Sequence, residues 1–209
     1  MMEKTEVRIV AGSLRGRKVT CVVHPGLRPT PQMVREALFS ILGNAVPGRV
    51  FYDVFAGTGV VGMESISRGA SGARLIEKDA KQAAVIQNYL HRFQIADRAQ
   101  VLRADAYRWA ERWIPAGNAP VNLFLSPPFP DLSGEQGVEF LKHVNLLYAK
   151  APNESVLIIQ AEDGFPVDDL PDRKWWDVRS YGRNILMFRV KGDEIESTEA
   201  MAENQVHPQ

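Results

Sequence analysis

Two short segments of the sequence carry residues whose types and spacing suit chemistry. The first is Asp53-Val54-Phe55-Ala56-Gly57-Thr58-Gly59, which follows the strand-like residues 50–52. The second is Ser126-Pro127-Pro128-Phe129, which follows the apolar residues 121–125. Open α/β sheets bind ligands at the carboxyl ends of their strands. We therefore expect the two segments to face each other at one edge of a sheet.

The glycine loop, residues 53–59, is predicted to bind S-adenosylmethionine. With Gly62 it also matches G-x-G-x-x-G, and Glu77 ends the next strand-like run, where an acid would bind ribose hydroxyls. A nicotinamide-dependent oxidoreductase is therefore an alternative, as is a tight turn without a ligand. The carboxylate of Asp53 favours the methyl donor, because it would repel a dinucleotide pyrophosphate but suits an ammonium group.

Asp105 ends a third strand-like run, where it could accept a hydrogen bond from an adenine amino group. An Asp before a helix is also a common N-cap, and residues 106–113 have a helical pattern, so both roles stay open. The residues predicted to line the cofactor site are Asp53, Phe55, Ala56, Gly57, Thr58, Gly59, Glu77, Asp105 and Ala106.

The Ser126–Phe129 turn is predicted to hold an amino group. Its prolines have fixed φ and no N–H groups, so its carbonyls and the Ser126 hydroxyl offer acceptors in a rigid turn. Such acceptors help to localise the lone pair of a nucleobase amine, and Phe129 would stack on a base that has left its own stack. The methylated amine loses its proton readily, so Ser126, Pro127, Pro128 and Phe129 would catalyse mostly by positioning. The alternative is a proline-rich loop with Phe129 packed on the core.

Alternating patterns predict a doubly wound α/β fold, with helices on both faces of a mainly parallel sheet. Strand-like runs lie near 50–55, 72–77, 99–103, 120–126 and 154–160, and helical patterns lie near 60–69, 79–92, 105–113 and 135–150. Two further strand-like runs, Trp175–Tyr181 and Asn184–Val190, predict a terminal hairpin.

The N-terminal region is predicted to form a small extension of this sheet. Residues 7–23 indicate a basic β-hairpin, and Thr30-Pro31 begins a helix that runs to about Leu42. We expect three parts: the extension at 1–48, a methyltransferase domain at 49–190, and an acidic, disordered tail at 191–209.

The composition is that of a soluble globular protein, with 45% apolar and 24% charged residues. A single cysteine, Cys21, and a charged start without a signal peptide predict a cytoplasmic location. No apolar run is long enough to cross a membrane. The four histidines show no metal-ligand spacing, so no metal is expected. The net charge of zero conceals a basic N-terminal region and an acidic C-terminal one.

The chain resembles the bacterial small-subunit (16S) ribosomal RNA guanine-N2 methyltransferases, which belong to the S-adenosylmethionine-dependent class with a seven-stranded sheet. The resemblance covers about residues 7–190. Its specific parts are Arg8-Ile9-Val10-Ala11-Gly12 with Arg15-Gly16-Arg17, and Leu27-Arg28-Pro29-Thr30 with Val34-Arg35-Glu36. The glycine loop and the Pro127-Pro128-Phe129 turn also occur in adenine-N6 and protein glutamine methyltransferases, so these two parts indicate chemistry rather than substrate.

This resemblance implies that the protein methylates the N2 amino group of a guanine in 16S ribosomal RNA, within the small ribosomal subunit and as a monomer. It implies that the glycine loop, Glu77 and Asp105 line the cofactor pocket. The residues that would contact RNA or organise its approach are Arg8, Arg15, Arg17, Lys18, Arg28 and Arg35. A solvated basic face is the alternative, and Arg28 and Arg35 could instead pair with Glu36 or bind carbonyls near the pocket.

The sequence departs from the family pattern at Ser126, where Asp is usual. A hydrogen bond to a charged acceptor contributes about 1.5–3 kcal/mol, against about 0.5–1.5 kcal/mol for a neutral one. The difference, on the order of 1 kcal/mol, predicts a loss of less than tenfold in rate. Two further alternatives are a catalytically weak or inactive RNA-binding protein of ribosome assembly, and a methyltransferase acting on adenine N6.

Overall fold

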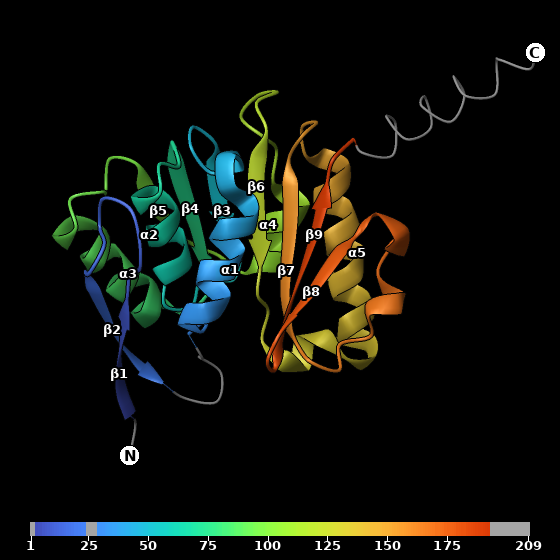
Figure 1. Cartoon of the computed structure of the whole chain (residues 1–209), viewed down its shortest axis with the longest axis horizontal. Coiled ribbons are helices and arrows are strands. Elements are labelled where there is room, and N and C mark those ends of the chain that lie inside the picture. The colour runs from blue at the N-terminus through green and yellow to red at the C-terminus, as the bar shows by residue number, and fades with distance from the viewer. Residues whose placement is uncertain (1–2, 24–28, 193–209) are drawn as a thin grey trace, which may run out of the picture.

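The computed structural model describes residues 3–23 and 29–192. A sheet of seven strands forms the centre of the molecule. The strand order is β5-β4-β3-β6-β7-β9-β8 (Figure 1). The five strands from β5 to β7 are parallel, and β9 runs antiparallel to both β7 and β8. The predicted mainly parallel sheet with a terminal hairpin is confirmed. The strands are β3 (Val50–Asp53), β4 (Gly72–Glu77), β5 (Ala99–Arg103), β6 (Val121–Leu125), β7 (Val156–Glu162), β8 (Asp177–Tyr181) and β9 (Asn184–Val190).

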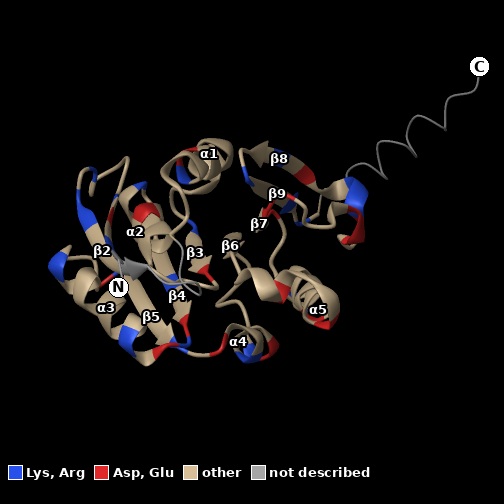
Figure 2. Ribbon diagram, turned by 90° about the horizontal axis from the view of Figure 1, so that it is seen from below, with Lys and Arg blue, Asp and Glu red and all other residues tan. Residues whose placement is uncertain are grey.

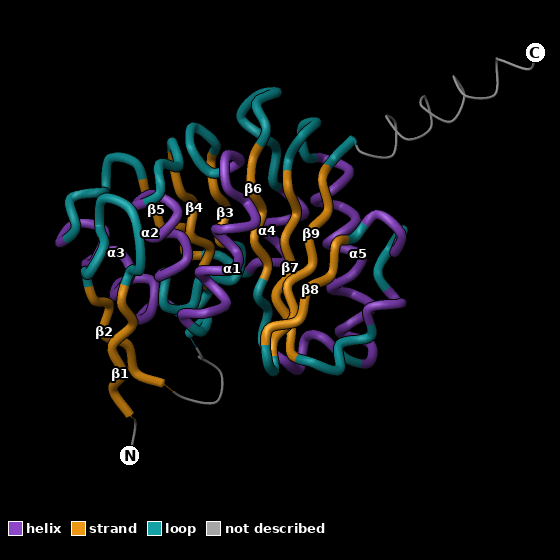
Figure 3. The backbone as a smooth tube through the Cα atoms, viewed as in Figure 1, coloured by secondary structure: helices purple, strands orange, loops and turns teal. Residues whose placement is uncertain are grey.

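Helices cover both faces of the sheet, as Figures 1 and 3 show. Successive residues of a strand point to opposite faces. Phe51 accordingly packs into the core under α1, α2 and α3, whereas Tyr52 packs under α4 and α5. The α-helices are α1 (Gln32–Leu42), α2 (Val60–Ser67), α3 (Ala80–Arg92), α4 (Ala106–Arg112) and α5 (Gly134–Lys150), and the short 3₁₀ turns are η1 (Gly43–Ala45), η2 (Phe129–Leu132), η3 (Val167–Asp169) and η4 (Arg173–Trp175).

The N-terminal hairpin consists of the antiparallel strands β1 (Glu3–Arg8) and β2 (Lys18–Val23). The sequence pattern predicts strands from about Val7, but residues 9–17 form a loop that docks on the molecule. Ile9 and Leu14 of this loop are buried in the core beside α1, α2 and α3. The N–H of Leu14 donates to Oγ of Ser67 at 2.9 Å. The burial of Ile9 and Leu14 and this hydrogen bond to α2 therefore determine the conformation of the loop.

The hairpin lies toward the end of the molecule at which the parallel strands have their carboxyl ends (Figure 1). Figure 2 looks onto this end and shows α1 to α3 on one side of the sheet and α4 and α5 on the other. Within residues 3–23 and 29–192, no helix is long and apolar enough to span a membrane. The division of the chain at residue 48 stays a prediction, and the expected tail from residue 193 onward lies outside the described residues.

Candidate active site

The two predicted segments meet beside the central strand β3. This strand pairs with β4 on one side and with β6 on the other, so its carboxyl end is a topological switch point. Asp53 is in register with Phe124, two residues before Ser126. The glycine loop and the Ser126–Phe129 turn therefore leave the sheet side by side, at the place where open α/β sheets bind ligands.

The carboxylate of Asp53 lies beneath the glycine loop. It is 1% exposed, and its Oδ2 accepts a 3.0 Å hydrogen bond from the N–H of Gly62 in α2. Burial raises the pKa of Asp53 to about 7; the hydrogen bond from Gly62 acts in the opposite direction, and the negative charge of Glu77 adds to the rise. Asp53 thus joins the end of β3 to the first turn of α2 and supports the loop from below.

Glycine is required in the loop itself and just after it. Gly57 and Gly59 have φ of +53° and +72°, in the left-handed region that side chains disfavour. A Cβ on Gly62 would lie 2.7 Å from Cδ2 of Leu75 on β4, so this third glycine lets α2 approach the sheet. Of the other loop residues, Ala56 and Thr58 are buried and Phe55 is partly buried.

Glu77 at the end of β4 holds the loop from the side. Its Oε2 accepts the N–H of Gly57 at 2.9 Å, and its Oε1 accepts the N–H of Asp79 at 2.7 Å. Burial raises the pKa of the Glu77 carboxyl, although both hydrogen bonds lower it. A carboxylate has about four acceptor positions, so Glu77 keeps the capacity to bind ribose hydroxyls.

Asp105 caps the first turn of α4. Its Oδ1 accepts the N–H groups of Tyr107 and Arg108, both at 3.1 Å. The capping role is present, and contact with an adenine amino group stays a prediction. Ala106, the first residue of α4, is buried against the core.

The Ser126–Phe129 turn presents both polar and aromatic surface. Ser126 and Pro128 are partly buried and Pro127 is buried. Phe129 begins η2 and is 38% exposed, which leaves an aromatic surface beside the switch point. This exposure favours stacking over the alternative in which Phe129 packs only on the core.

Tyr107 and Asp131, to which the sequence patterns assigned no role, connect the two halves of the site. The Tyr107 hydroxyl donates to Oδ2 of Asp131 in η2 at 2.7 Å, and the Tyr107 ring meets Phe55 edge-on with centroids 5.7 Å apart. Each residue lies two positions after a predicted site residue, Asp105 and Phe129. Their closeness in sequence to predicted site residues was the signal that could have identified them. No local sequence pattern, however, predicts that residues from two different segments form a hydrogen bond.

Four of the predicted RNA-binding residues lie on the exposed part of the hairpin. Arg8, Arg15, Arg17 and Lys18 are all exposed. Lys18 pairs with Glu6 at 2.5 Å, and the Arg17 guanidinium lies 5.7 Å from the centre of the Phe93 ring. Their contact with RNA stays a prediction, and Arg28 lies outside the described residues.

Arg35 requires a correction, because a side chain that is 1% exposed cannot contact RNA in this arrangement. Its Nε donates to Oε2 of Glu64 at 3.1 Å, its Nη1 to the carbonyl of Thr30 at 2.5 Å, and its Nη2 to the carbonyl of Arg8 at 2.7 Å. Arg35 therefore has a structural role, as the alternative prediction stated: it binds main-chain carbonyls. Its carboxylate partner, however, is Glu64 and not Glu36. It fixes the hairpin to the start of α1.

Among the residues that the structure describes, no group of three or more His, Cys, Asp or Glu side chains is arranged to hold a metal ion. The carboxylates of Asp53, Glu77 and Asp105 are instead separate, at or just after the ends of three different strands.

A family model described as Conserved hypothetical protein 95 matches residues 7–190. The chain belongs to this family. The chain is similar to Ribosomal RNA small subunit methyltransferase D of Escherichia coli K12, with 32% identity over 77% of this chain and 78% of the relative. The protein of the same name from Haemophilus influenzae is 29% identical over 90% of this chain and 94% of the relative.

Solved structures agree with this family assignment. A hypothetical protein of Thermus thermophilus matches with a TM-score of 0.69 and 26% identity, over 88% of this chain and 99% of that chain. A 16S rRNA N2 methyltransferase of T. thermophilus, in complex with AdoMet and guanosine, matches with a TM-score of 0.67. That match covers 91% of this chain and 51% of the other at 20% identity, so it shows the fold alone. The fold is that of the S-adenosylmethionine-dependent class that the sequence predicted.

Proposed function

We propose that this protein transfers the methyl group of S-adenosylmethionine to the N2 amino group of a guanine in the RNA of the small ribosomal subunit. Membership of the family makes the chain an enzyme that methylates ribosomal RNA. The observation that carries the proposal is that the glycine loop and the Ser126–Phe129 turn leave neighbouring strands at one switch point. We further propose that the enzyme acts in the cytoplasm as a monomer, with residues 1–48 as an RNA-binding extension of the catalytic domain.

The residues around the glycine loop fit S-adenosylmethionine. Its ribose hydroxyls and adenine amino group are hydrogen-bond donors, and Glu77 and Asp105 supply carboxylate acceptors at the ends of two adjacent strands. Asp53, at the end of the next strand, is buried beneath the loop and would act on the methionine ammonium through its charge. The ionised form of Asp53 would also balance the positive charge of the ammonium. When bound, S-adenosylmethionine supplies an electrophilic methyl group on a sulfonium.

The protein would contribute positioning and hydrogen-bond acceptors to methyl transfer. The Ser126 hydroxyl and the carbonyls of the proline turn would accept hydrogen bonds from the guanine N2 amino group and hold its lone pair toward the methyl group. Phe129 would stack on the base after it has left the RNA stack. No side chain has to act as a strong base, because the methylated amine loses a proton readily to water.

The exposed basic residues of the hairpin support RNA as the substrate. Arg8 and Lys18 form the loop end of the hairpin, Arg15 and Arg17 lie in the loop between them, and all four are exposed. Contacts of this kind with phosphates position RNA without reading its sequence. We expect RNA affinity to fall steeply with salt.

Mass mapping of small-subunit RNA from cells with and without this protein tests the proposal. The expected result is one methylated guanine that disappears in the strain lacking the protein and returns when purified enzyme and S-adenosylmethionine are added to its small subunits. Loss of a methylated adenine instead would identify the adenine N6 alternative. Binding of S-adenosylmethionine by calorimetry without any tritium transfer would identify an inactive RNA-binding protein.

A further inference from the structure

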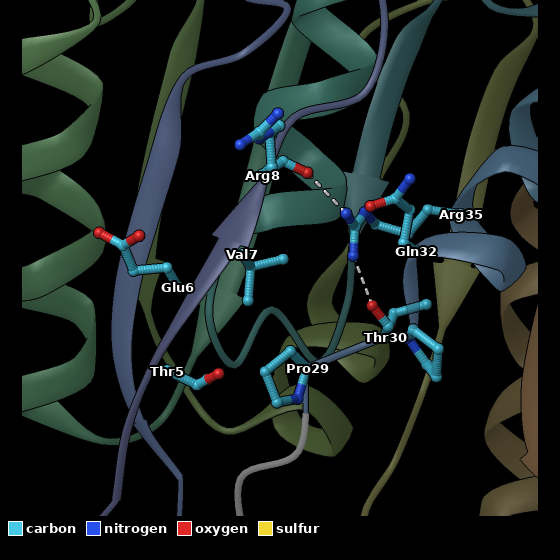
Figure 4. Close-up of a pocket in the computed structure, with 9 residues that line it drawn as sticks. Thr5, Glu6, Val7, Arg8, Pro29, Thr30, Gln32 and Arg35 are labelled. Atoms are coloured by element: carbon cyan, nitrogen blue, oxygen red, sulfur yellow. Dashed lines mark hydrogen bonds between the residues drawn. The ribbon is translucent and has the colours of Figure 1, made fainter.

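A concave site lies between β1 and the start of α1, apart from the glycine loop and the Ser126–Phe129 turn. It is a pocket of about 300 Å³. Its walls include Thr5 and Val7 from β1, Pro29 and Thr30 from the segment before α1, and Gln32 and Arg35 from the first turn of α1. Glu6 and Arg8 also border the pocket. Figure 4 shows Thr5 and Val7 facing Pro29 and Thr30 across this space, whereas the Glu6 side chain points to the other side of the strand.

A hydrogen bond connects this pocket to the strand beside the methyl-transfer turn. The Thr30 hydroxyl donates to Oε1 of Gln160 on β7 at 2.9 Å. β7 pairs with β6 so that Ile159 is opposite Leu125, which brings the next residues, Gln160 and Ser126, to neighbouring positions. Adjacent strands are about 4.7–4.9 Å apart. The pocket therefore lies at the same edge of the sheet as Ser126, displaced by about one strand and one side chain.

Excess positive charge lies behind the pocket. Glu64 is fully buried and accepts hydrogen bonds from both Arg35, at 3.1 Å, and Arg68, at 2.8 Å. One carboxylate therefore faces two guanidinium groups, which leaves a net positive cluster. The three hydrogen bonds of Arg35 fix its position, so the charge is held in place and favours an anionic group in the pocket.

The remaining walls suit a flat apolar group attached to that anion. Val7 and Pro29 offer apolar surface, and the Thr5 hydroxyl, from the middle of β1, offers a donor and an acceptor. A volume of about 300 Å³ is at the small end of ligand pockets, which fits one nucleotide better than a helical segment of RNA.

We propose that this pocket receives the nucleotide next to the guanine that is methylated. This inference rests on the proposed function. The base of that nucleotide lies against Val7 and Pro29, and its phosphate lies toward the side of the buried Arg35, which acts on it through its charge and not by direct contact. Extruding a base requires that the flanking nucleotides are held, because enzymes of this kind read or grip the positions on either side of the target.

A pair of matched variants on the hairpin tests the pocket. Thr5→Trp fills it, whereas Thr20→Trp makes the same change at an exposed site on the other face of the hairpin, where Thr20 is in register with Glu6. We expect Thr5→Trp to raise the KM for small subunits from the deletion strain by about tenfold. Its dissociation constant for S-adenosylmethionine, measured by calorimetry, should equal that of the wild type, and Thr20→Trp should match the wild type in both measurements.

A photoreactive benzophenone amino acid at position 5 gives a readout that does not depend on turnover. Illumination with unmethylated small subunits, followed by reverse transcription, should map the crosslink to a nucleotide adjacent to the methylated guanine. A crosslink elsewhere in the RNA, or none, would overturn the pocket assignment. So would equal KM values for Thr5→Trp and Thr20→Trp. A wild-type enzyme that transfers no methyl group to ribosomal RNA would instead overturn the proposed function.

Discussion

Tyr107 in α4 and Asp131 in η2 are joined by a 2.7 Å hydrogen bond from the tyrosine hydroxyl to Oδ2 of the carboxylate. Tyr107 also packs edge-on against Phe55 of the glycine loop. Burial, together with the hydrogen bond to Asp131, raises the pKa of Tyr107, so the hydroxyl keeps its proton and stays a donor. This bond ties the turn that would hold the base to the loop and helix that would hold the cofactor.

Removing this bond should loosen the base-binding turn without affecting the cofactor. We expect Tyr107→Phe to lower the rate of methyl transfer by about tenfold, the loss that corresponds to one hydrogen bond to a charged acceptor. The dissociation constant for S-adenosylmethionine should stay within a factor of about two. Single-turnover transfer and calorimetry measure the two quantities.

Changes at Asp131 provide the controls for the Tyr107 variant. Asp131→Ala should reproduce the defect of Tyr107→Phe, and the double variant should be no worse than either one. Asp131→Asn keeps an acceptor and should keep most of the activity. Additive losses in the double variant would show that the two residues act independently.

A comparison of Gly12 with Gly16 distinguishes two reasons for glycine in this loop: close contact with the rest of the molecule and positive φ. Both have positive φ, +82° and +86°. A Cβ on Gly12 would lie 1.8 Å from the carbonyl oxygen of Ser67 in α2, whereas a Cβ on Gly16 would have nothing within 4 Å. Only Gly12 is therefore pressed against the rest of the molecule.

We expect Gly12→Ala to lower the free energy of unfolding by several kcal/mol, because the loop must move away from α2. Gly16→Ala has only the conformational cost, about 1 kcal/mol. Urea unfolding of the two variants measures the difference. Similar losses would mean that positive φ, rather than contact with Ser67, makes glycine necessary at residue 12.

Much of the fold could be predicted because its signals are local. The apolar pattern before Asp53 predicts a strand, and the glycines after it predict a turn. The two prolines at 127 and 128 predict a second turn, and the alternation of strands and helices predicts the sheet. The burial of Arg35 and its ion-pair partner could not be predicted in this way. Its sequence neighbour Glu36 suggested a pair, but the packing of α1 beside α2 buries Arg35 against Glu64 instead. Tertiary packing, not sequence spacing, selects that partner.

Titration of Asp53 should make the stability of the protein depend on pH. Its pKa is about 7 in the folded state, against an ordinary value of 3.8, so the folded state binds more protons between these values. The free energy of unfolding should therefore fall as the pH rises from about 4 to about 7, and this contribution should level off above pH 7. Urea unfolding across this range, compared with Asp53→Asn, isolates the effect. Parallel curves for the two proteins would contradict it.

Phe129 provides a test of base stacking. We expect Phe129→Ala to lose most methyl transfer, because stacking on one base contributes about 1–3 kcal/mol. Phe129→Tyr keeps the ring and should stay active. Because the side chain is 38% exposed, the free energy of unfolding should change little in either variant. An alanine variant with normal transfer would eliminate the stacking role.

The resemblance predicts Asp at position 126, where this chain has Ser, and introducing Asp there tests what the acceptor contributes. Ser126 follows β6 in a partly buried position, next to the buried Pro127. A carboxylate would accept hydrogen bonds from the guanine amino group more strongly than a hydroxyl, by on the order of 1 kcal/mol. We therefore expect Ser126→Asp to retain or raise the rate of transfer by less than tenfold, and Ser126→Ala to lower it. Single-turnover assays on small subunits from the deletion strain compare the three proteins. A rate for Ser126→Ala equal to that of the wild type would mean that the carbonyls of the proline turn, rather than the side chain at 126, hold the amino group.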